Sequence, residues 1–277
     1  MLILVSTPIG NLSDISKRAI DTLNEADIIA CEDTRTSAQL FSLIGVKAKK
    51  LIPYHEHNAG SARPKIISFL EQGLTIALVS DAGTPLISDP GYRLVRECHQ
   101  KGIQVSTVPG ANAVLSALQL SGLPSDAFLF AGFLPNKKTA RQETLQKHKN
   151  VSATLIFYET ANRLIASLED ILEVLGDREM AVVREITKKF EEVKNDSVAN
   201  LLTFYQQNGA PKGELVIVID RLSTTNNIED IDELIKKTLK THSTKDTALL
   251  VSKATGVHKK EVYQKILDYQ NAQEEKI

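Results

Sequence analysis

The chain has 277 residues, enough for one large domain or two ordinary ones with an additional tail. Hydrophobic residues make up 42% and charged residues 24%, a globular composition that excludes a disordered or fibrous chain. The 33 lysines and arginines balance 34 aspartates and glutamates. The resulting net charge of -1 argues against a uniformly basic coat for nucleic acid, although it leaves room for a local basic patch.

Cysteine content and hydropathy indicate the compartment. Cys31 and Cys98 are too few to build a disulfide framework, which favours a reducing cytoplasm. No apolar stretch reaches the roughly 18 residues that a membrane-spanning helix needs. The apolar residues 2–5 lack the preceding basic segment of a signal peptide. We therefore expect a soluble, cytoplasmic protein with no membrane anchor and no targeting segment.

The first part of the chain alternates short apolar runs with segments of helical period. The predicted strands are residues 2–6, 28–31, 49–52, 75–80 and 104–108. Between them, apolar residues recur three and four positions apart, which is typical of helices. Strands that alternate with helices predict a parallel sheet covered on both faces. The turn-forming pair Pro109-Gly110 marks the expected end of this first α/β domain, residues 1–110.

Residues 111–222 predict a second α/β domain of more mixed character. It begins with a helix at residues 111–120, and further helices contain residues 165–175 and 201–205. The predicted strands are residues 153–158, 180–183, 191–194 and 214–220. We expect some of these strands to be antiparallel, with residues 191–194 at an edge.

The composition changes again after a polar linker at residues 223–227. Apolar spacing predicts a helix around residues 231–239. A helix at 247–255, a tight turn at Gly256 and a helix at 259–269 then resemble a helix-turn-helix. These elements form a predicted small helical domain, residues 228–277. Its many lysines are either a solvated face or a surface for phosphates.

Three unusual loops follow predicted strands, at residues 6–11, 31–36 and 80–91. In an open parallel sheet, ligands bind at the carboxyl ends of the strands, where these loops lie. The sequence contains neither the glycine-lysine pattern of a phosphate-binding loop nor GxGxxG, which disfavours an ordinary dinucleotide site.

The loop at residues 80–91 has two interpretations. Its glycines would let a ligand approach the backbone, while Asp81 and Thr84 offer a carboxylate and a hydroxyl. In the alternative, Ser88 or Asp89 caps the following helix, with Pro90 in its first turn.

The loop at residues 31–36 gathers Glu32, Asp33 and Arg35 at one strand end. As a cluster beside two rigid loops, these charges favour a functional site. In the alternative, Asp33 or Thr34 caps the next helix and Arg35 pairs locally.

The histidines in the run Tyr-His-Glu-His-Asn, residues 54–58, could suggest a metal site. However, the sequence offers no evident third ligand and no HExxH motif. We therefore expect no metal, and interpret this run as a loop that faces RNA or substrate, or as plain surface.

Several further runs complete a pattern that extends along nearly the whole chain. In order, the runs are TPIGNL (7–12), EDTRT (32–36), YHEHN (54–58), VSDAGTPLISDPG (79–91), VPGANA (108–113), GFLP (132–135), IFYE (156–159), REITKKFEE (184–192) and PKGE (211–214). Together they resemble the ribosomal RNA small subunit methyltransferase I family, within the tetrapyrrole-methylase superfamily. Asn112 departs from the usual Pro or Ser, and Ile186 from the usual Leu.

This resemblance implies an S-adenosylmethionine-dependent enzyme that methylates the ribose 2′-oxygen of a cytidine in the decoding centre of 16S ribosomal RNA. It implies two α/β domains of the tetrapyrrole-methylase type with the cofactor in the cleft between them, here followed by the small helical tail. It also implies a homodimer that acts on the small ribosomal subunit. The implied cofactor contacts are Pro8, Ile9, Gly10, Asp81, Gly83, Thr84, Pro85, Ile87, Asn112, Ala113, Tyr158, Gly213 and Glu214.

The chemistry does not require a protein nucleophile, because a sulfonium already activates its methyl group. The protein must align the 2′-oxygen and exclude water, and a carboxylate could accept the hydroxyl proton. We hypothesise that Asp33 is this base or orients the hydroxyl, and that Arg35 binds a phosphate. Glu32 and Asp89 are the alternative bases.

Basic residues outside this cluster are expected to bind the RNA. They are His55, Lys137, Lys138, Lys188, Lys189, Lys259 and Lys260. Two other functions stay open on the same sequence: a methyltransferase for a tetrapyrrole-like small molecule, and a non-catalytic RNA- or ribosome-binding module.

Overall fold

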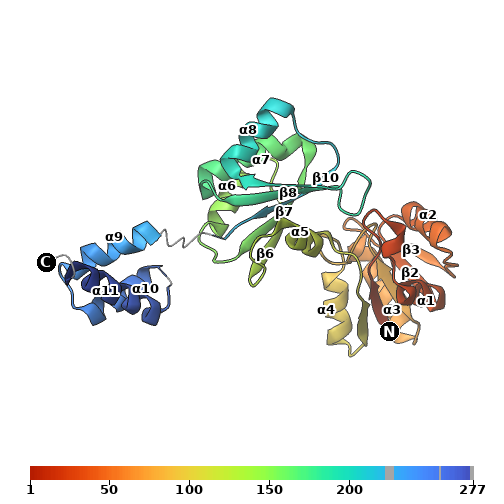
Figure 1. The fold of residues 1–277 in the computed structure, drawn as a ribbon. Helices are drawn as coiled ribbons and strands as arrows, with labels where there is room; N and C mark the ends of the chain where they lie inside the picture. The colour runs from red at the N-terminus through yellow and green to blue at the C-terminus, as the bar shows by residue number, and fades with distance from the viewer. Residues whose placement is uncertain (222–227, 256, 275–277) are drawn as a thin grey trace. The chain divides into compact units, whose positions relative to one another are not determined.

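The computed structural model describes residues 1–221, 228–255 and 257–274 (Figure 1). The chain divides into two compact units, Met1–Arg221 and Leu222–Ile277. The first unit contains two five-stranded sheets, and the chain passes from one to the other near residue 110, which we keep as the proposed domain boundary.

The first sheet is entirely parallel, as the alternation of strands and helices predicted. Its strand order is β3-β2-β4-β1-β5. The strands are β1 (Leu2–Val5), β2 (Ile28–Cys31), β3 (Leu51–Pro53), β4 (Ile76–Val79) and β5 (Val105–Val108). The helical elements are η1 (Leu12–Asp14), α1 (Lys17–Glu25), α2 (Thr34–Ile44), α3 (Ala59–Glu71) and α4 (Tyr92–Gln100). Only β3 is displaced from its prediction, by two residues.

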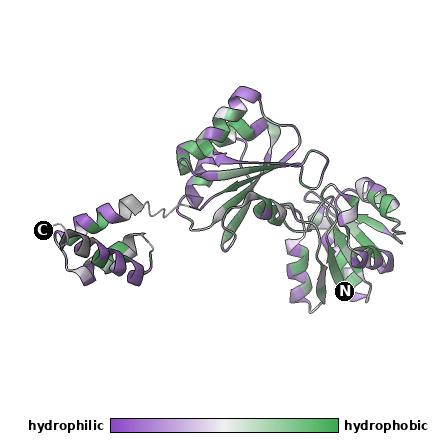
Figure 2. Cartoon of the chain, viewed as in Figure 1, coloured by the Kyte–Doolittle hydropathy of each residue, from purple (hydrophilic) through white to green (hydrophobic). Residues whose placement is uncertain are grey.

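Both faces of this sheet are buried, because alternate residues of each strand point to opposite sides. In β4, Ile76 and Leu78 pack with α3 and α4, whereas Ala77 and Val79 pack with α1 and α2. The hydropathy colouring in Figure 2 follows this arrangement, with apolar strands inside and polar helix surfaces outside. Continuous apolar strands are therefore the signature of a sheet covered on both faces.

The second sheet is mixed, with strand order β6-β7-β10-β8-β9. The β6–β7 pair is parallel, and the other pairs are antiparallel, as predicted. The strands are β6 (Phe128–Phe133), β7 (Thr154–Thr160), β8 (Glu179–Arg184), β9 (Glu192–Ser197) and β10 (Glu214–Ile219). The edge position of β9 is confirmed, while the last strand of the unit, β10, lies at the centre.

Helices cover both faces of the second sheet. One face packs against α5 (Ala113–Ser121). The other packs against α6 (Lys138–His148), α7 (Leu164–Leu175) and α8 (Val198–Asn208), with the short η2 (Ala161–Arg163) before α7. The strand β6 and the helix α6 were not predicted from the sequence. The inward face of α6 contains a buried arginine, Arg141, beside Leu145, so its apolar periodicity is weak.

The second unit is a small helical domain, as the amphipathic spacing predicted. It consists of α9 (Ile228–Leu239), α10 (Thr244–Thr255) and α11 (Lys259–Glu274). Ile235, Val251 and Ile266 are among the residues of its apolar core. The predicted linker at residues 223–227 and the predicted turn at Gly256 lie outside the described residues. Over the part of the chain that the structure describes, no helix is long and apolar enough to span a membrane.

Candidate functional site

A pocket of about 460 Å3 lies within the first unit and is lined from both sheets. The first sheet contributes the loops after β1, β2 and β4, which are neighbouring strands. The second contributes the ends of β6 and β7, the loop after β8 and the start of β10. The lining residues are Ile9, Glu32, Asp81, Ala82, Gly83, Thr84, Ile87, Ser88, Asp89, Asn112, Ala113, Phe133, Tyr158, Glu159, Thr160, Ile186, Gly213, Glu214, Leu215 and Val216.

The loops after β1 and β4 are joined by backbone hydrogen bonds. The Thr7 amide donates to the Gly83 carbonyl at 2.9 Å, and the Gly83 amide donates back at 3.1 Å. Gly83 has φ +80°, and a Cβ there would lie 3.2 Å from the Ile9 side chain. The close approach of the two loops therefore favours glycine at this position.

The start of α5 completes this side of the pocket. The Thr84 hydroxyl donates to the Ala111 carbonyl at 3.1 Å, which connects the β4 loop to the chain before α5. Asn112 is the N-cap of α5, and its side chain accepts from the Leu115 amide at 3.1 Å. Asn112 and Ala113 thus place the amino end of a helix at the pocket wall.

The capping interpretation of the loop at residues 80–91 is wrong. The N-cap of α4 is Gly91, with φ +140°, so neither Ser88 nor Asp89 occupies that position. Leu86 and Ser88 instead adopt left-handed conformations, with φ of 73° and 64°. Non-glycine residues adopt this region at an energetic cost and are enriched at functional sites. The strained loop turns Ser88 and Asp89 toward the pocket.

The β2 and β4 loops bring three carboxyl groups to the pocket lining, those of Glu32, Asp81 and Asp89. The Asp33 amide donates to Asp81 at 3.1 Å, which holds the two loops together. Burial raises the pKa of Asp89 to about 6, and the charges of Glu32 and Asp81 add to this rise. Burial and the charge of Asp81 likewise raise the pKa of Glu32. Glu32 and Asp89 therefore have elevated proton affinity, as acid–base groups of enzymes commonly do.

Asp33 and Arg35 have a different environment. Asp33 caps α2 and accepts from the Arg35 amide at 2.8 Å, as the capping interpretation predicted. The Arg35 side chain also donates to the Asp33 carboxylate at 2.9 Å. These hydrogen bonds lower the pKa of Asp33 to about 2, and neither residue lines the pocket. A carboxylate with such low proton affinity is a weak general base near neutral pH.

The second sheet supplies an aromatic wall. The ring centroids of Tyr158 and Phe130 lie 4.8 Å apart, and those of Tyr158 and Phe133 lie 5.3 Å apart. Burial raises the pKa of Tyr158 to about 12, helped by the charges of Asp89 and Glu214. The pocket thus has an aromatic side and an acidic side, contributed largely by different sheets.

Lys188 connects the loops of the two sheets. Its ammonium donates to Glu185 and to Glu214, both at 2.9 Å. Its stem passes over Gly10, where a Cβ would lie 2.5 Å from the Lys188 Cγ. Lys188, expected from sequence to bind RNA, is therefore engaged with two carboxylates of its own chain. Gly10 and Gly213 both provide space, the latter for the side chain of Glu185.

Most of the predicted cofactor contacts line the pocket, whereas Pro8, Gly10 and Pro85 are not among its lining residues. His55 is close enough for its charge to act on Glu32. Lys137 and Lys138 lie at the start of α6 and are not among the lining residues.

The other predicted RNA contacts are exposed lysines. Lys189 lies over the ring of Phe190 at 5.6 Å. Lys259 and Lys260 begin α11 in the helical tail.

Some lining residues were not proposed from the sequence. Phe133, Glu159 and Ile186 occur within the matching runs, but no local pattern indicated that they face the pocket. Phe133 follows a β-bulge, Glu159 forms an ion pair with Arg163, and Ile186 lies between two residues with positive φ. Among the described residues, no group of three His, Cys, Asp or Glu side chains is arranged to hold a metal ion.

Two family models match the chain. The one described as tetrapyrrole (corrin/porphyrin) methylases covers residues 1–202, and the one described as the RsmI C-terminal HTH domain covers residues 226–270. The chain is 47% identical over 269 residues to the ribosomal RNA small subunit methyltransferase I of Mesorhizobium japonicum, covering 96% of this chain and 91% of that protein. It is 41% identical over 270 residues to the protein of the same name from Haemophilus influenzae, covering 95% of each.

Solved structures with lower sequence identity share the fold of the first unit. A diphthine synthase matches with a TM-score of 0.59 and 16% identity, over 79% of this chain and 90% of that one. A uroporphyrin-III-C-methyltransferase from Thermus thermophilus matches with a TM-score of 0.53 and 19% identity, over 80% and 94% of the two chains. At these identities the likeness concerns the fold alone.

Proposed function

This chain belongs to the ribosomal RNA small subunit methyltransferase I family, within the tetrapyrrole methylases, and from that premise we propose its reaction. We propose that it transfers a methyl group from S-adenosylmethionine to the ribose 2′-oxygen of a cytidine in the decoding centre of 16S ribosomal RNA. The observation that carries the proposal is the pocket, which the loops with the family's motifs build together.

The residues of the pocket fit S-adenosylmethionine. A volume of about 460 Å3 is within the range of pockets that enclose a small ligand. The carboxylates of Asp81 and Glu214 suit a cationic ligand, and Gly83 and Gly213 are also in the lining. We propose that these residues, with Ala113 and the remaining lining residues predicted from sequence, hold the cofactor. When bound, the cofactor would supply an electrophilic methyl group.

The protein's own contribution is alignment, exclusion of water and acceptance of a proton. We propose that Asp89 accepts the proton of the 2′-hydroxyl, with Glu32 as its neighbour in the same acidic wall. A pKa of about 6 leaves Asp89 mostly ionised at neutral pH while retaining useful proton affinity. Asp33, the base that the sequence suggests, is less suitable because Arg35 stabilises its charged form.

Binding of RNA is proposed to involve charges outside the pocket. Lys259 and Lys260 lie in the first turn of α11, where the helix dipole adds to their attraction for phosphate. Lys137, Lys138 and Lys189 are further proposed phosphate contacts, and Arg35 is exposed beside the pocket loops. We keep the homodimer and the cytoplasmic location as parts of this proposal.

The function is tested by incubating the full chain with methyl-labelled cofactor and three substrates in parallel. The substrates are small ribosomal subunits that lack the modification, bare 16S RNA and a tetrapyrrole precursor. Label in an alkali-resistant dinucleotide containing the target cytidine supports 2′-O-methylation. Label in the tetrapyrrole, or in a base of the RNA, contradicts the proposal. Calorimetry with S-adenosylmethionine distinguishes the enzyme from a non-catalytic RNA-binding module. The module would show no binding of the cofactor.

The assignment of the base is tested with a matched pair of variants, Asp89→Asn and Asp33→Asn. Single-turnover methylation should fall by about 100- to 10,000-fold in Asp89→Asn, in the range of general-base catalysis. Asp33→Asn should keep most of the rate, provided that both variants bind the cofactor normally. The opposite ranking would return the role of the base to Asp33.

A further inference from the structure

Phe133 is the last residue of β6 and lines the pocket with 55% of its surface exposed. By contrast, the apolar lining residues Ile186, Leu215 and Val216 are each at most 7% exposed. Phe133 therefore lies at the margin of the pocket, while these aliphatic residues form its interior. Of the large apolar residues in the lining, Phe133 is the most exposed, followed by Ile87 at 38%.

A β-bulge directs Phe133 to this position. The pairing of β6 with β7 shifts register between Phe130 and Phe133, and Gly132 has φ +71°. A Cβ at Gly132 would lie 3.5 Å from the Ser88 hydroxyl, so the bulge lies against the loop after β4. Bulges of this kind re-aim a side chain and occur next to active sites.

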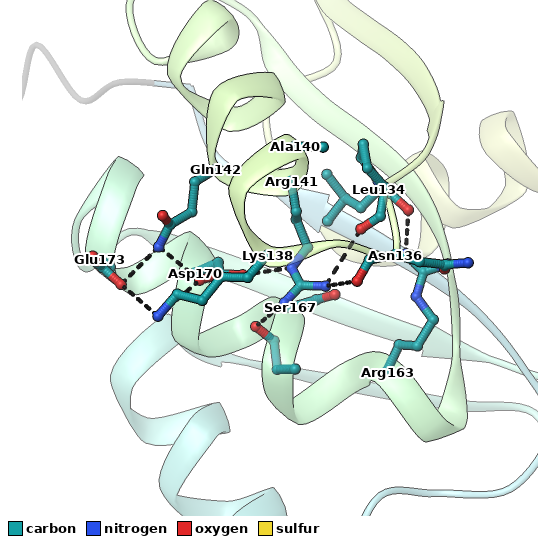
Figure 3. Close-up of polar contacts among 12 residues, drawn as sticks. Leu134, Asn136, Lys138, Ala140, Arg141, Gln142, Arg163, Ser167, Asp170 and Glu173 are labelled. Carbon is teal, nitrogen blue, oxygen red and sulfur yellow. Dashed lines mark hydrogen bonds and ion pairs between the residues drawn. The ribbon is translucent and has the colours of Figure 1, made fainter.

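The chain directly after Phe133 is firmly held. Figure 3 shows the cluster of polar side chains that holds it. The Arg141 guanidinium donates to the carbonyls of Pro135 and Asn136, at 3.4 and 3.2 Å. Arg163 donates to the carbonyl of Leu134, and Leu134 itself is 1% exposed. The exposed ring is thus carried by a well-anchored strand end, so its position is pre-organised.

Neighbouring aromatic rings fix the orientation of the Phe133 ring. Its plane is tilted by 60° from that of Tyr158, at a centroid distance of 5.3 Å. Tyr158 also packs edge-on against Phe130, at 4.8 Å and 62°. Because Tyr158 is tilted against the ring rather than stacked on it, the exposed surface of Phe133 can serve as a platform for a planar group.

We propose that Phe133 stacks against the base of the target nucleotide. This proposal rests on the proposed function, in which a ribose 2′-oxygen enters the pocket. A nucleotide whose sugar enters a pocket of about 460 Å3 must leave the stack of its neighbours. An aromatic ring at the margin replaces the lost stacking partner, as aromatic side chains do in proteins that bind single-stranded RNA.

The position of Phe133 favours the base of the substrate over the adenine of the cofactor. Asp89, the proposed proton acceptor, and its neighbour Glu32 line the same pocket, and the ribose must lie beside Asp89. The base attached to that ribose would then extend toward the margin, where Phe133 lies. A ligand enclosed in the interior would contact the buried wall instead.

The test compares Phe133→Ala, Phe133→Leu and Phe133→Trp, with Phe128→Ala as the control. Phe128 begins the same strand, is 44% exposed and is not among the lining residues. For each variant, kcat/KM is measured with unmodified small subunits at saturating cofactor. The dissociation constant of S-adenosylhomocysteine is measured by calorimetry, and the midpoint of thermal unfolding checks folding.

We expect kcat/KM to fall about 10- to 100-fold in Phe133→Ala, in the range of one lost stacking contact. Phe133→Leu, which keeps an apolar side chain but lacks a π-face, should fall similarly, and Phe133→Trp should stay close to the native chain. The affinity for S-adenosylhomocysteine and the activity of Phe128→Ala should change less than twofold. If Phe133→Ala folds poorly, the comparison of Leu with Trp decides.

Two results would overturn the proposal. In the first, Phe133→Leu retains native activity, so that the ring is only an apolar contact. In the second, the affinity for S-adenosylhomocysteine falls by the same factor as kcat/KM, so that the ring serves the adenine. A native chain that methylates no RNA refutes the proposed function itself, and this outcome is visible before any variant is compared.

Discussion

Removing the carboxylate of Asp170 should destabilise the first unit more than almost any surface substitution. Asp170 is 1% exposed and Arg141 is 5% exposed, and the Arg141 Nε lies 2.6 Å from the Asp170 carboxylate (Figure 3). Gln142 also donates to Asp170 at 2.9 Å. In Asp170→Ala the Arg141 guanidinium would stay buried. It would keep its hydrogen bonds to the carbonyls of Pro135 and Ala166 but lose the carboxylate that neutralises its charge.

The expected size follows from the burial of both partners. Breaking a buried ion pair by removing one partner costs about 3–5 kcal/mol, because the remaining charge is uncompensated. For a unit of the size of Met1–Arg221, each kcal/mol lowers the melting temperature by about 2–4 °C. Asp170→Ala should therefore lower the melting temperature of this unit by roughly 6–20 °C.

Glu173 provides the matched control on the same helix. Its side chain is 60% exposed, and it pairs with Lys138 at 3.4 Å. An exposed pair contributes about 0–1 kcal/mol, so Glu173→Ala should shift the melting temperature by no more than about 4 °C. Urea unfolding, monitored by far-ultraviolet circular dichroism, gives the free energies of unfolding. A loss below about 1 kcal/mol in Asp170→Ala, equal to that in Glu173→Ala, would refute the reasoning.

Three other predictions concern the site and the tail. Since the pKa of Asp89 is raised from 3.8 to about 6, the methylation rate should fall as the pH decreases through about 6, and Asp89→Asn should remove this inflection. The folded chain binds this proton more tightly than the unfolded chain does, so the associated stability is lost as the pH rises through 6. Asp89→Asn should consequently be at least as stable as the native chain at pH 8. Gly10→Ala should weaken the binding of S-adenosylhomocysteine measured by calorimetry, because the new Cβ would collide with the Lys188 stem. Gly45→Ala is the control: its Cβ meets open space, so it should suffer backbone strain without loss of binding. Lys259→Glu should weaken RNA binding and reduce its dependence on salt, and unchanged filter-binding curves from 50 to 200 mM salt would contradict a role in phosphate binding.

Local patterns in the sequence determined the architecture of the first sheet. The run at residues 76–79 is apolar throughout because both faces of β4 are covered, and this pattern is readable without the fold. The neighbouring loops after β1, β2 and β4 could be placed at one edge because parallel strands end on the same side. Sequence runs also pointed to Gly83, Thr84 and Tyr158, which do line the pocket.

The helix α6 and the strand β6 could not be predicted in this way. The helix α6 buries Arg141, and a charged residue on the inward face interrupts the apolar periodicity. The residue that neutralises this charge, Asp170, lies 29 residues away and so outside any local pattern. Similarly, the bulge that directs Phe133 depends on pairing with β7 and on contact with the loop after β4. Such partners are distant in sequence, so no local window contains them.

The sequence by itself determined which residue types gather at the strand ends: carboxylates, glycines and hydroxyls in rigid loops. Only the tertiary structure decided which of these carboxyl groups has an elevated proton affinity. Asp33 and Asp89 are the same residue type in similar loops, and both are half-buried, yet Arg35 donates to the carboxylate of Asp33 whereas Asp89 lies near the charges of Glu32 and Asp81. Desolvation and neighbouring charges set the pKa, and both depend on segments that only folding brings together.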